Sequence, residues 1–220
     1  TDIAGNMSDV TPFSFFLDTT AAAPRVSLVA DTGASATDRV TTTGALSVTG
    51  TEANAALQYS IDGGTTWTGD FSAVEGVNSV RVRQIDAAGN VSQPTLLSFT
   101  RDTSAPAALA IALASDTGAS ASDRVTRTGT VTVSGAETGA KVEYSSDAGA
   151  TWRTSFVAVQ GDNTVIVRQT DAAGNQSPEA SLSFKLDTLA AAPVVALAND
   201  TGKSATDKIT SDGALNVVTE

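Results

Sequence analysis

Recurring pairs of aspartates are the residues of this chain best suited to chemistry, because carboxylate oxygens are preferred ligands of Ca²⁺. Residues 31–38 read DTGASATD, which places an aspartate at each end of a short loop. The pattern returns at residues 116–123 and 200–207, after 85 and then 84 residues. A carboxylate pair that recurs at the length of a small domain predicts a cation site for each domain rather than a single active site.

A second motif recurs with the same period, which indicates an array of repeats. Residues 85–90 read IDAAGN, residues 170–175 read TDAAGN, and residues 1–6 read TDIAGN. The sequence therefore predicts four segments. They are the C-terminal tail of one repeat (1–18), two complete repeats (19–102 and 103–187), and the N-terminal part of a further repeat (188–220).

The composition excludes several classes of function. The chain has 24 acidic and 13 basic residues, a formal net charge of −11, and neither histidine nor cysteine. A surface of this sign repels nucleic acid and anionic membranes, so we expect neither as a partner. Without imidazole or thiol groups, the commonest acid–base, nucleophilic and zinc-binding side chains are absent. No stretch approaches the roughly 20 apolar residues of a membrane-spanning helix, so we expect no membrane insertion.

The hydrophobic pattern of one repeat alternates with a period of two, which is typical of strands. Residues 19–102 predict seven short strands: 25–30, 45–50, 55–61, 65–68, 71–74, 78–84 and 95–101. The predicted inward side chains are Leu46, Val48, Leu57, Tyr59, Ile61, Val80, Val82, Leu97 and Phe99. This pattern indicates an all-β fold of tandem immunoglobulin-like sandwiches. The short connectors 19–24, 103–106 and 188–193 contain proline and favour an extended rod.

The repeated acids are expected to meet where consecutive sandwiches join. In such a sandwich the loop after the first strand and the loop before the last strand lie at opposite ends. Loop 31–38 should therefore approach loop 170–175 of the next repeat, beside the connector that begins at Asp102. The predicted Ca²⁺ ligands of this complete site are Asp31, Asp38, Asp102, Asp171 and Asn175.

Two partial sites follow from the same reasoning. Half of the preceding site would consist of Asp18, Asp86 and Asn90. Half of the following site would consist of Asp116, Asp123 and Asp187. A simpler interpretation stays open for each motif, since aspartate caps turns and glycine and asparagine tolerate the left-handed conformation.

Residues 60–67 (SIDGGTTW) and 145–152 (SSDAGATW) fit the Asp-box pattern that also occurs in sialidases. A glycosidase would need a tyrosine nucleophile or a pair of carboxylates across a cleft. Tyr59 and Tyr144 are expected at inward strand positions, and Trp67 and Trp152 are expected to pack in the core. We therefore interpret the Asp-boxes as hairpin-stabilising elements and expect no enzymatic activity.

The combined motifs resemble the tandem bacterial Ig-like repeats of giant surface adhesins of the type I-secreted, RTX and non-fimbrial classes. The resemblance covers essentially the whole chain. It implies a stalk at the bacterial cell surface that carries a separate ligand-binding domain and serves adhesion or biofilm formation. It also implies Ca²⁺ bound by acidic loops and connectors at positions that match Asp31, Asp38 and Asp102.

The leading hypothesis is a non-enzymatic extracellular spacer stiffened by Ca²⁺, whose partners are the neighbouring repeats of its own chain. Any host ligand would then be bound by other domains. The alternative is an Ig-like module that itself binds a glycan or a protein, which an exposed aromatic platform would favour.

Overall fold

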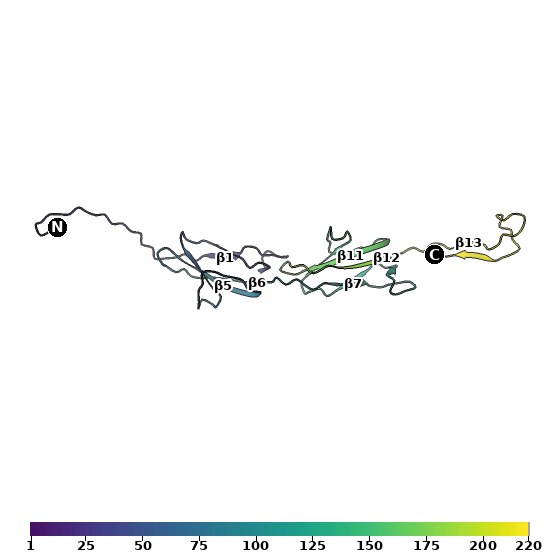
Figure 1. Cartoon of the computed structure of the whole chain (residues 1–220), viewed down its shortest axis with the longest axis horizontal. Helices are drawn as coiled ribbons and strands as arrows, with labels where there is room; N and C mark the ends of the chain where they lie inside the picture. Colours follow the sequence, from purple (N-terminus) through teal and green to yellow (C-terminus); the bar gives the residue numbers. More distant parts are fainter. Residues whose placement is uncertain (220) are drawn as a thin grey trace. The chain divides into compact units, whose positions relative to one another are not determined.

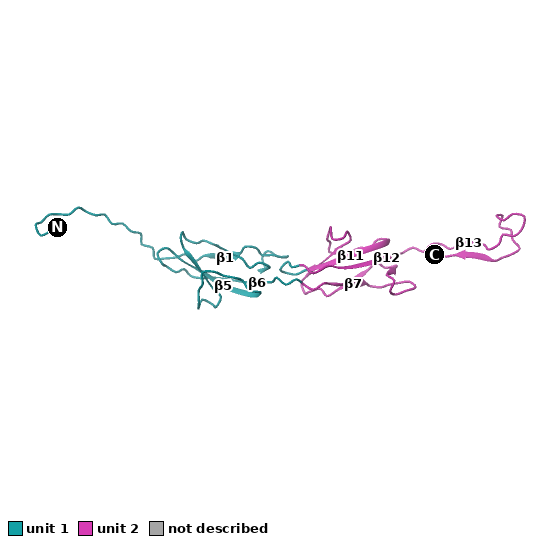
Figure 2. Cartoon of the chain, in the orientation of Figure 1, with its two compact units in different colours: residues 1–105, 170–175 teal, residues 106–169, 176–220 magenta. Residues whose placement is uncertain are grey.

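The computed structural model describes residues 1–219, and every regular element in that range is a β-strand (Figure 1). The chain divides into two compact units (Figure 2). Unit 1 comprises residues 1–105 and 170–175, and unit 2 comprises residues 106–169 and 176–220. Among the described residues no helix has the length and apolar character of a membrane span.

Unit 1 contains two sheets, in which most neighbouring strands are antiparallel. Its strands are β1 (Arg25–Leu28), β2 (Val40–Thr41), β3 (Leu46–Thr49), β4 (Ala56–Ser60), β5 (Gly76–Ile85) and β6 (Thr95–Arg101). One sheet has the order β2-β6-β5-β4, and the other pairs β1 with β3. The contact of β2 with β6 is parallel, whereas the other pairings are antiparallel.

Strand β5 shows how the sequence selects its buried face. Its buried side chains alternate along the strand and are Asn78, Val80, Val82 and Gln84. Alternation directs one row of side chains to the core, so the two valines fill it and the two amides lie at its ends. The amide groups satisfy backbone atoms there, as expected of buried polar groups.

The two sheets of unit 1 share one hydrophobic core. Val80, Val82, Leu97 and Phe99 are buried at its centre. Side chains of β1 and β3 pack against them from the opposite sheet: Val26, Leu28, Leu46 and Val48. The arrangement is a β-sandwich, which confirms the predicted fold class.

Three details of the predicted strands are wrong. Residues 65–68 and 71–74 form no strand, and Thr68 makes only an isolated bridge to Tyr59. Ile61 is 74% exposed because β4 ends at Ser60 and the chain enters a turn. Strand β2 was not predicted, since its two residues are recognised only by their pairing with β6.

Unit 2 repeats this arrangement. Its strands are β7 (Ala110–Leu113), β8 (Val125–Thr126), β9 (Val131–Ser134), β10 (Lys141–Ser145), β11 (Gly161–Thr170), β12 (Ala180–Leu186), β13 (Val194–Leu197) and β14 (Leu215–Val218). The sheets are β10-β11-β12-β8, β7-β9 and β13-β14. Val165, Val167, Leu182 and Phe184 form the centre of its core, together with Leu109 and Leu186.

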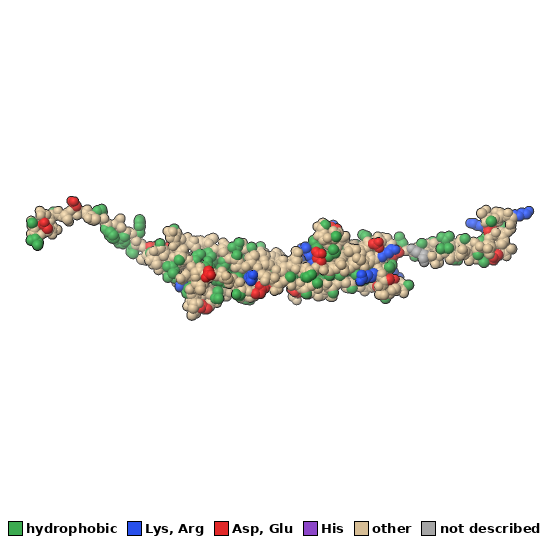
Figure 3. All heavy atoms as spheres, in the orientation of Figure 1, with side chains coloured by type: hydrophobic (Ala, Val, Ile, Leu, Met, Phe, Trp, Pro, Cys, Tyr) green, Lys and Arg blue, Asp and Glu red, His purple; other side chains and the backbone are tan. Residues whose placement is uncertain are grey.

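Apolar side chains remain exposed toward both ends of the chain. Residues 1–18 contain no strand, and Figure 3 shows apolar side chains along the N-terminal segment. The large exposed ones include Phe13, Phe15, Phe16 and Leu17. The β13-β14 pair exposes Val194, Leu215 and Val218. The apolar side chains of these segments are of the kind that fills a sandwich core, but here they belong to neither hydrophobic core of the described residues.

Candidate metal centre

The first part of the candidate site is a closed turn that follows strand β5. Asp86 Oδ1 accepts a hydrogen bond from the Asn90 backbone N–H at 2.8 Å, and its Oδ2 accepts one from Asn90 Nδ2 at 2.7 Å. The side chain of Asp86 is buried, and Gly89 supplies the positive φ of 91° that closes the turn. The Asn90 amide is the main cause that lowers the pKa of Asp86, so this carboxylate stays charged.

The second part is Glu52, in the loop that follows β3. Its backbone N–H donates to Gln84 Oε1 at 2.9 Å, and its own Oε1 accepts from the Ala22 N–H at 2.7 Å. The buried Gln84 thus positions the loop, and the connector residue Ala22 orients the carboxylate.

Asp18 completes the group from the preceding segment of the chain. Asn90 Nδ2 donates to the backbone carbonyl of Asp18 at 3.1 Å, while Asp18 Oδ1 accepts from the Thr20 N–H at 3.2 Å. The amide of Asn90 therefore links the Asp86 turn to the backbone of Asp18.

Asp18, Glu52 and Asp86 form what we name the acidic cluster: one carboxylate oxygen from each lies within 4.8 Å of the others. Two carboxylates about 4 Å apart repel each other by about 1–4 kcal/mol, depending on the effective dielectric constant. None of the ion pairs found in residues 1–219 involves these side chains. An arrangement of this kind gains from a bound cation.

The donor set fits Ca²⁺. Calcium takes six to eight oxygens at 2.3–2.6 Å, so two of its ligands are at most about 5 Å apart. The three carboxylate oxygens meet that limit. Further ligands would come from backbone carbonyls or water, as is usual for calcium sites.

Sequence reasoning placed Asp18, Asp86 and Asn90 in this region but missed Glu52. A signal was present, because Glu137 follows Glu52 by 85 residues and each stands two residues after a glycine that directly follows a strand. An acid that recurs with the repeat period is a candidate ligand even when it lies outside a recognisable motif.

The predicted aspartate loop, residues 31–38, forms a compact corner. Asp31 Oδ2 accepts from the Arg39 N–H at 3.0 Å, and Asp38 Oδ1 accepts from the Val40 N–H at 3.0 Å. Both aspartates therefore cap backbone groups, as the turn interpretation predicted. Within the described part of the chain, Asp31 and Asp38 belong to no group of three clustered acids.

One oxygen in this loop has no partner. Asp31 Oδ1 is buried without a hydrogen bond, and the equivalent atoms of Asp116 and Asp200 share that condition. A buried carboxylate oxygen normally has a hydrogen-bond donor or a cation as its partner, and the same oxygen lacks a protein donor in all three copies. Asp116 and Asp123 cap Arg124 and Val125 as their counterparts do in the first repeat.

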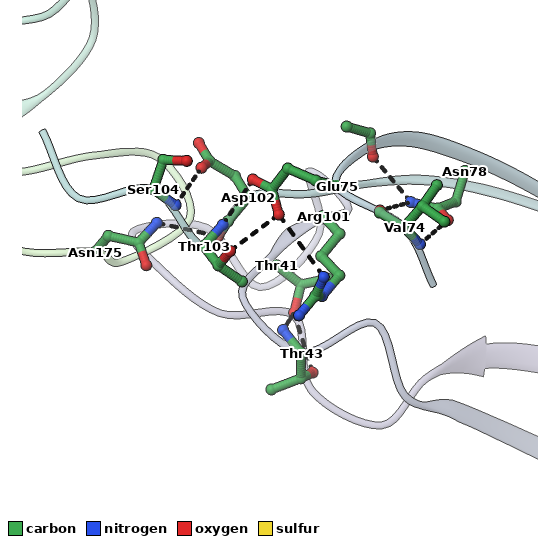
Figure 4. A network of polar contacts seen from close by, with 11 residues as sticks. Thr41, Thr43, Val74, Glu75, Asn78, Arg101, Asp102, Thr103, Ser104 and Asn175 are labelled. Atoms are coloured by element: carbon green, nitrogen blue, oxygen red, sulfur yellow. Dashed lines mark hydrogen bonds and ion pairs between the residues drawn. The ribbon is translucent and has the colours of Figure 1, made fainter. Parts of the chain in front are cut away.

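The connector at Asp102 is held by polar contacts inside unit 1 (Figure 4). Asn175 Nδ2 donates to the Asp102 carbonyl at 3.0 Å, and Asp102 Oδ1 accepts from the Ser104 N–H at 2.9 Å. Glu75 accepts from both the backbone and the hydroxyl of Thr103, whose N–H is the main cause of the lowered pKa of Glu75.

Asp171 and Asn175 reproduce the turn of Asp86 and Asn90. Asp171 Oδ1 accepts from the backbone N–H groups of Gly174 and Asn175, both at 2.8 Å, and its Oδ2 accepts from Asn175 Nδ2 at 2.9 Å. The structure thus brings Asp102, Asp171 and Asn175 together through the Asn175 amide. It does not gather their carboxylates with those of Asp31 and Asp38 into one acidic group among residues 1–219.

Asp187 lies at the equivalent connector position of the second repeat. Its carboxylate accepts from the Leu189 N–H and from Gln160 Nε2, and these bonds lower its pKa, with the Leu189 contact first. The side chain is therefore charged and available as an oxygen ligand.

The Asp-boxes are hairpin elements. Asp62 accepts from Ser60 Oγ, from the Thr65 N–H, and from the backbone and hydroxyl of Thr66, and these bonds lower its pKa, with the Thr66 hydroxyl first. Trp67 donates from Nε1 to the Gly64 carbonyl at 3.0 Å.

The tryptophans correct one expectation. Trp67 and Trp152 are half-buried and belong to neither core cluster of the described residues. Arg83 Cζ lies 3.9 Å from the ring centroid of Trp67, and Arg168 has the same relation to Trp152. The alternation of β5 and β11 places each arginine on the outer face, where it covers the ring as a cation–π partner.

A comparison with protein families supports an Ig-like repeat in the second half of the chain. Residues 104–188 match the family model described as a bacterial Ig-like domain. No similar sequence was found among the curated proteins. Among solved structures, the chain is similar to the fibronectin(III)-like modules of Clostridium thermocellum CbhA, at 12% sequence identity and a TM-score of 0.37, with coverage of 74% of this chain and 94% of that chain. Residues 104–188 are therefore an Ig-like module.

Proposed function

We propose that the chain is a spacer segment of a bacterial cell-surface adhesin, in which Ca²⁺ bound by repeated acidic residues stiffens the connectors. The observation that carries this proposal is the acidic cluster of Asp18, Glu52 and Asp86, which gathers three carboxylates beside a connector and takes part in none of the ion pairs of residues 1–219. The function is mechanical and non-enzymatic, and adhesion or biofilm formation belongs to the parent protein.

The repetition of the same residues supports a role shared along an array. The Asp-Thr-Gly loop occurs three times, and its unpartnered aspartate oxygen occurs in each copy. A binding or catalytic function would more often concentrate its residues in one place. The bacterial Ig-like match of residues 104–188 supports a module outside the cytoplasm, at the cell surface.

The expected ligands at the connector after the first complete repeat are the predicted ones: Asp31, Asp38, Asp102, Asp171 and Asn175. At the connector before the first complete repeat, the expected ligands are the acidic cluster and Asn90. At the connector after the second repeat, they are Asp116, Asp123 and Asp187. When Ca²⁺ is bound at these places, it compensates the charge of the carboxylates and thereby restrains the connector that carries them.

The proposal is tested by calorimetric titration of the 220-residue chain with Ca²⁺, together with thermal melting and small-angle scattering in Ca²⁺ and in chelator. Extracellular calcium modules bind with dissociation constants of about 10⁻⁴–10⁻³ M. At a Ca²⁺ concentration of about 100 times the dissociation constant, binding stabilises the folded state by about 2.7 kcal/mol. Mg²⁺ should substitute poorly, because it dehydrates reluctantly.

A null result is easy to recognise. If the melting temperature and the maximum dimension are the same with Ca²⁺ and with chelator, Ca²⁺ does not stiffen this segment. Replacing Asp31 and Asp38 together by asparagine should reproduce the effect of chelation at the connector that begins at Asp102 while the sandwich stays folded.

A further inference from the structure

Unit 1 also contains a contact between two loops that is made by a hydroxyl group and backbone atoms. Residues 170–175, which we name the docked loop, lie on a corner formed by Thr32 and Gly33. Thr32 Oγ1 donates to the Ala173 carbonyl at 2.6 Å and accepts from the Thr42 N–H at 2.8 Å. The Ala173 carbonyl is the nearer acceptor for this hydroxyl, because Thr42 Oγ1 lies 3.4 Å away.

The backbones of the corner and the docked loop touch at two glycines. A Cβ atom on Gly33 would lie 2.0 Å from the Ala172 carbonyl oxygen, a distance that no side chain can adopt. A Cβ atom on Gly174 would lie 3.1 Å from the Cα atom of Gly33. Both residues also have a positive φ, of 95° and 99°, which favours glycine. The contact therefore requires glycine at position 33, whereas the turn itself favours glycine at position 174, as it does at the equivalent Gly89.

The docked loop has a free counterpart of nearly identical sequence. Residues 86–90 and residues 171–175 both read DAAGN, and in both turns the aspartate carboxylate accepts from the asparagine N–H and the aspartate carbonyl accepts from the glycine N–H. Their asparagine side chains also make the same bond to a connector carbonyl, Asp18 in one case and Asp102 in the other. The two loops differ in burial: Ala173 is 0% exposed, whereas the equivalent Ala88 is exposed.

The corner has an open counterpart as well. Thr117 and Gly118 repeat Thr32 and Gly33, and Gly118 has a positive φ of 116°. A Cβ atom on Gly118 would meet nothing closer than the Val125 carbonyl at 3.9 Å. Thr117 Oγ1 accepts from the Arg127 N–H at 2.8 Å, as Thr32 does from Thr42. The corner is thus built by its own repeat, and the docked loop is an added contact.

We propose that the corner at Thr32 and Gly33 is a docking surface for the Asp-Ala-Ala-Gly-Asn loop, and that it holds the loop by shape and a neutral hydrogen bond without a metal ion. The contacts support this, because a hydroxyl, a carbonyl and two glycine backbones make the interface and no carboxylate oxygen crosses it. Calcium and docking are therefore separate restraints on the same part of the chain.

The test is hydrogen exchange of the 220-residue chain in chelator, with peptides that cover the two DAAGN loops. From the second residue of each loop onward the local sequence is identical, so the intrinsic exchange rates of residues 87–90 and 172–175 match, and we attribute a difference between them to the docking. We expect exchange in residues 171–175 to be at least tenfold slower than in residues 86–90. Equal rates in the two loops would refute the proposal.

The matched variants are Gly33→Ala and Gly118→Ala. Each places alanine at a positive φ, so the backbone strain is similar, but only Gly33→Ala meets a carbonyl of the docked loop. Gly33→Ala should raise exchange in residues 171–175 at least tenfold, and Gly118→Ala should leave it unchanged. The same rise with Gly118→Ala, or no rise with Gly33→Ala, contradicts docking at this corner.

A gentler variant covers the case in which Gly33→Ala does not fold. Thr32→Val keeps the shape of the side chain and removes the hydroxyl that donates to Ala173. Exchange in residues 171–175 should rise several-fold in this variant and not in Thr117→Val. Since all measurements are made in chelator, this result is independent of the calcium titration, and either proposal can fail without the other.

Discussion

Gln84 Nε2 donates a 2.6 Å hydrogen bond to the carbonyl of Ala22, which joins the last buried position of β5 to the connector at the start of the repeat. Its Oε1 accepts from the Glu52 N–H at 2.9 Å. Gln169 makes the equivalent bonds to Ala107 and Glu137. One buried amide in each repeat thus fastens the connector and the acid-bearing loop to the same strand.

Replacing Gln84 by alanine should destabilise unit 1 by about 2–4 kcal/mol. The change leaves a backbone donor and a backbone acceptor without their partner and opens a cavity in a fully buried position. Chemical denaturation of the variant measures the loss. Gln93→Ala is the control, since Gln93 is exposed on the same unit, and it should change the free energy of unfolding by less than about 0.5 kcal/mol. Similar effects of the two variants would show that Gln84 has no fastening role.

Truncation of the two adjacent leucines of β6 should lower the free energy of unfolding by very different amounts. Leu97 is 5% exposed and belongs to the core cluster, whereas Leu96 is 52% exposed on the other face of the strand. Leu97→Ala should cost about 2–5 kcal/mol through lost burial and a residual cavity. Leu96→Ala should cost less than about 0.5 kcal/mol. Denaturant unfolding of the two variants decides the matter, and equal losses would mean that the register of β6 is wrong.

The alternating core of the fold could be predicted from the sequence, and the irregular edge could not. Val80, Val82, Leu97 and Phe99 are buried as predicted, because a period of two leaves only one assignment that buries them. Residues 71–74 look like a strand but make no ladder, although Phe71 packs on the core. Strand formation there depends on a partner in space, which local sequence does not specify.

The candidate site was predictable only in part. Asp86 and Asn90 were found because they stand in a repeated motif, and the connector aspartate Asp18 was found by its repetition. Glu52 was missed because its place in the acidic cluster depends on the hydrogen bond from its backbone to Gln84, a contact between residues 32 positions apart. A long-range contact of this kind has no local sequence signature, so the recurrence of the acid as Glu137 was the signal that could have found it.

Glu52→Gln should weaken Ca²⁺ binding at the acidic cluster by about tenfold, because it removes one of three charges while the amide oxygen can still accept from the Ala22 N–H. Calorimetric titration of the variant measures the change in dissociation constant. Glu75→Gln is the control, since Glu75 binds Thr103 outside the cluster, and it should leave the affinity at this cluster as it is. An unchanged affinity in Glu52→Gln would remove Glu52 from the site.

The Asp-box of unit 2 should give a defined acid dependence. The Thr151 hydroxyl, then the Thr151 N–H and Ser145 Oγ, lower the pKa of Asp147 from 3.8 to about 2. Because the folded state holds its proton less tightly than the unfolded state, the stabilisation by this carboxylate is complete above about pH 4. It is lost as the pH falls from about 4 to about 2.

Titration of the Asp147 carboxyl carbon by NMR measures this pKa directly. Thr151→Val removes the largest cause and should move the pKa of Asp147 back toward 3.8. In thermal melts, Asp147→Asn should reduce the decrease in melting temperature between pH 4 and pH 2. The control Asp162→Asn, at an exposed position, should leave that decrease unchanged. If Asp147 titrates near 4 in the unmodified chain, the turn does not hold its carboxylate by these bonds, and the Asp-box cannot be the element that fixes this hairpin.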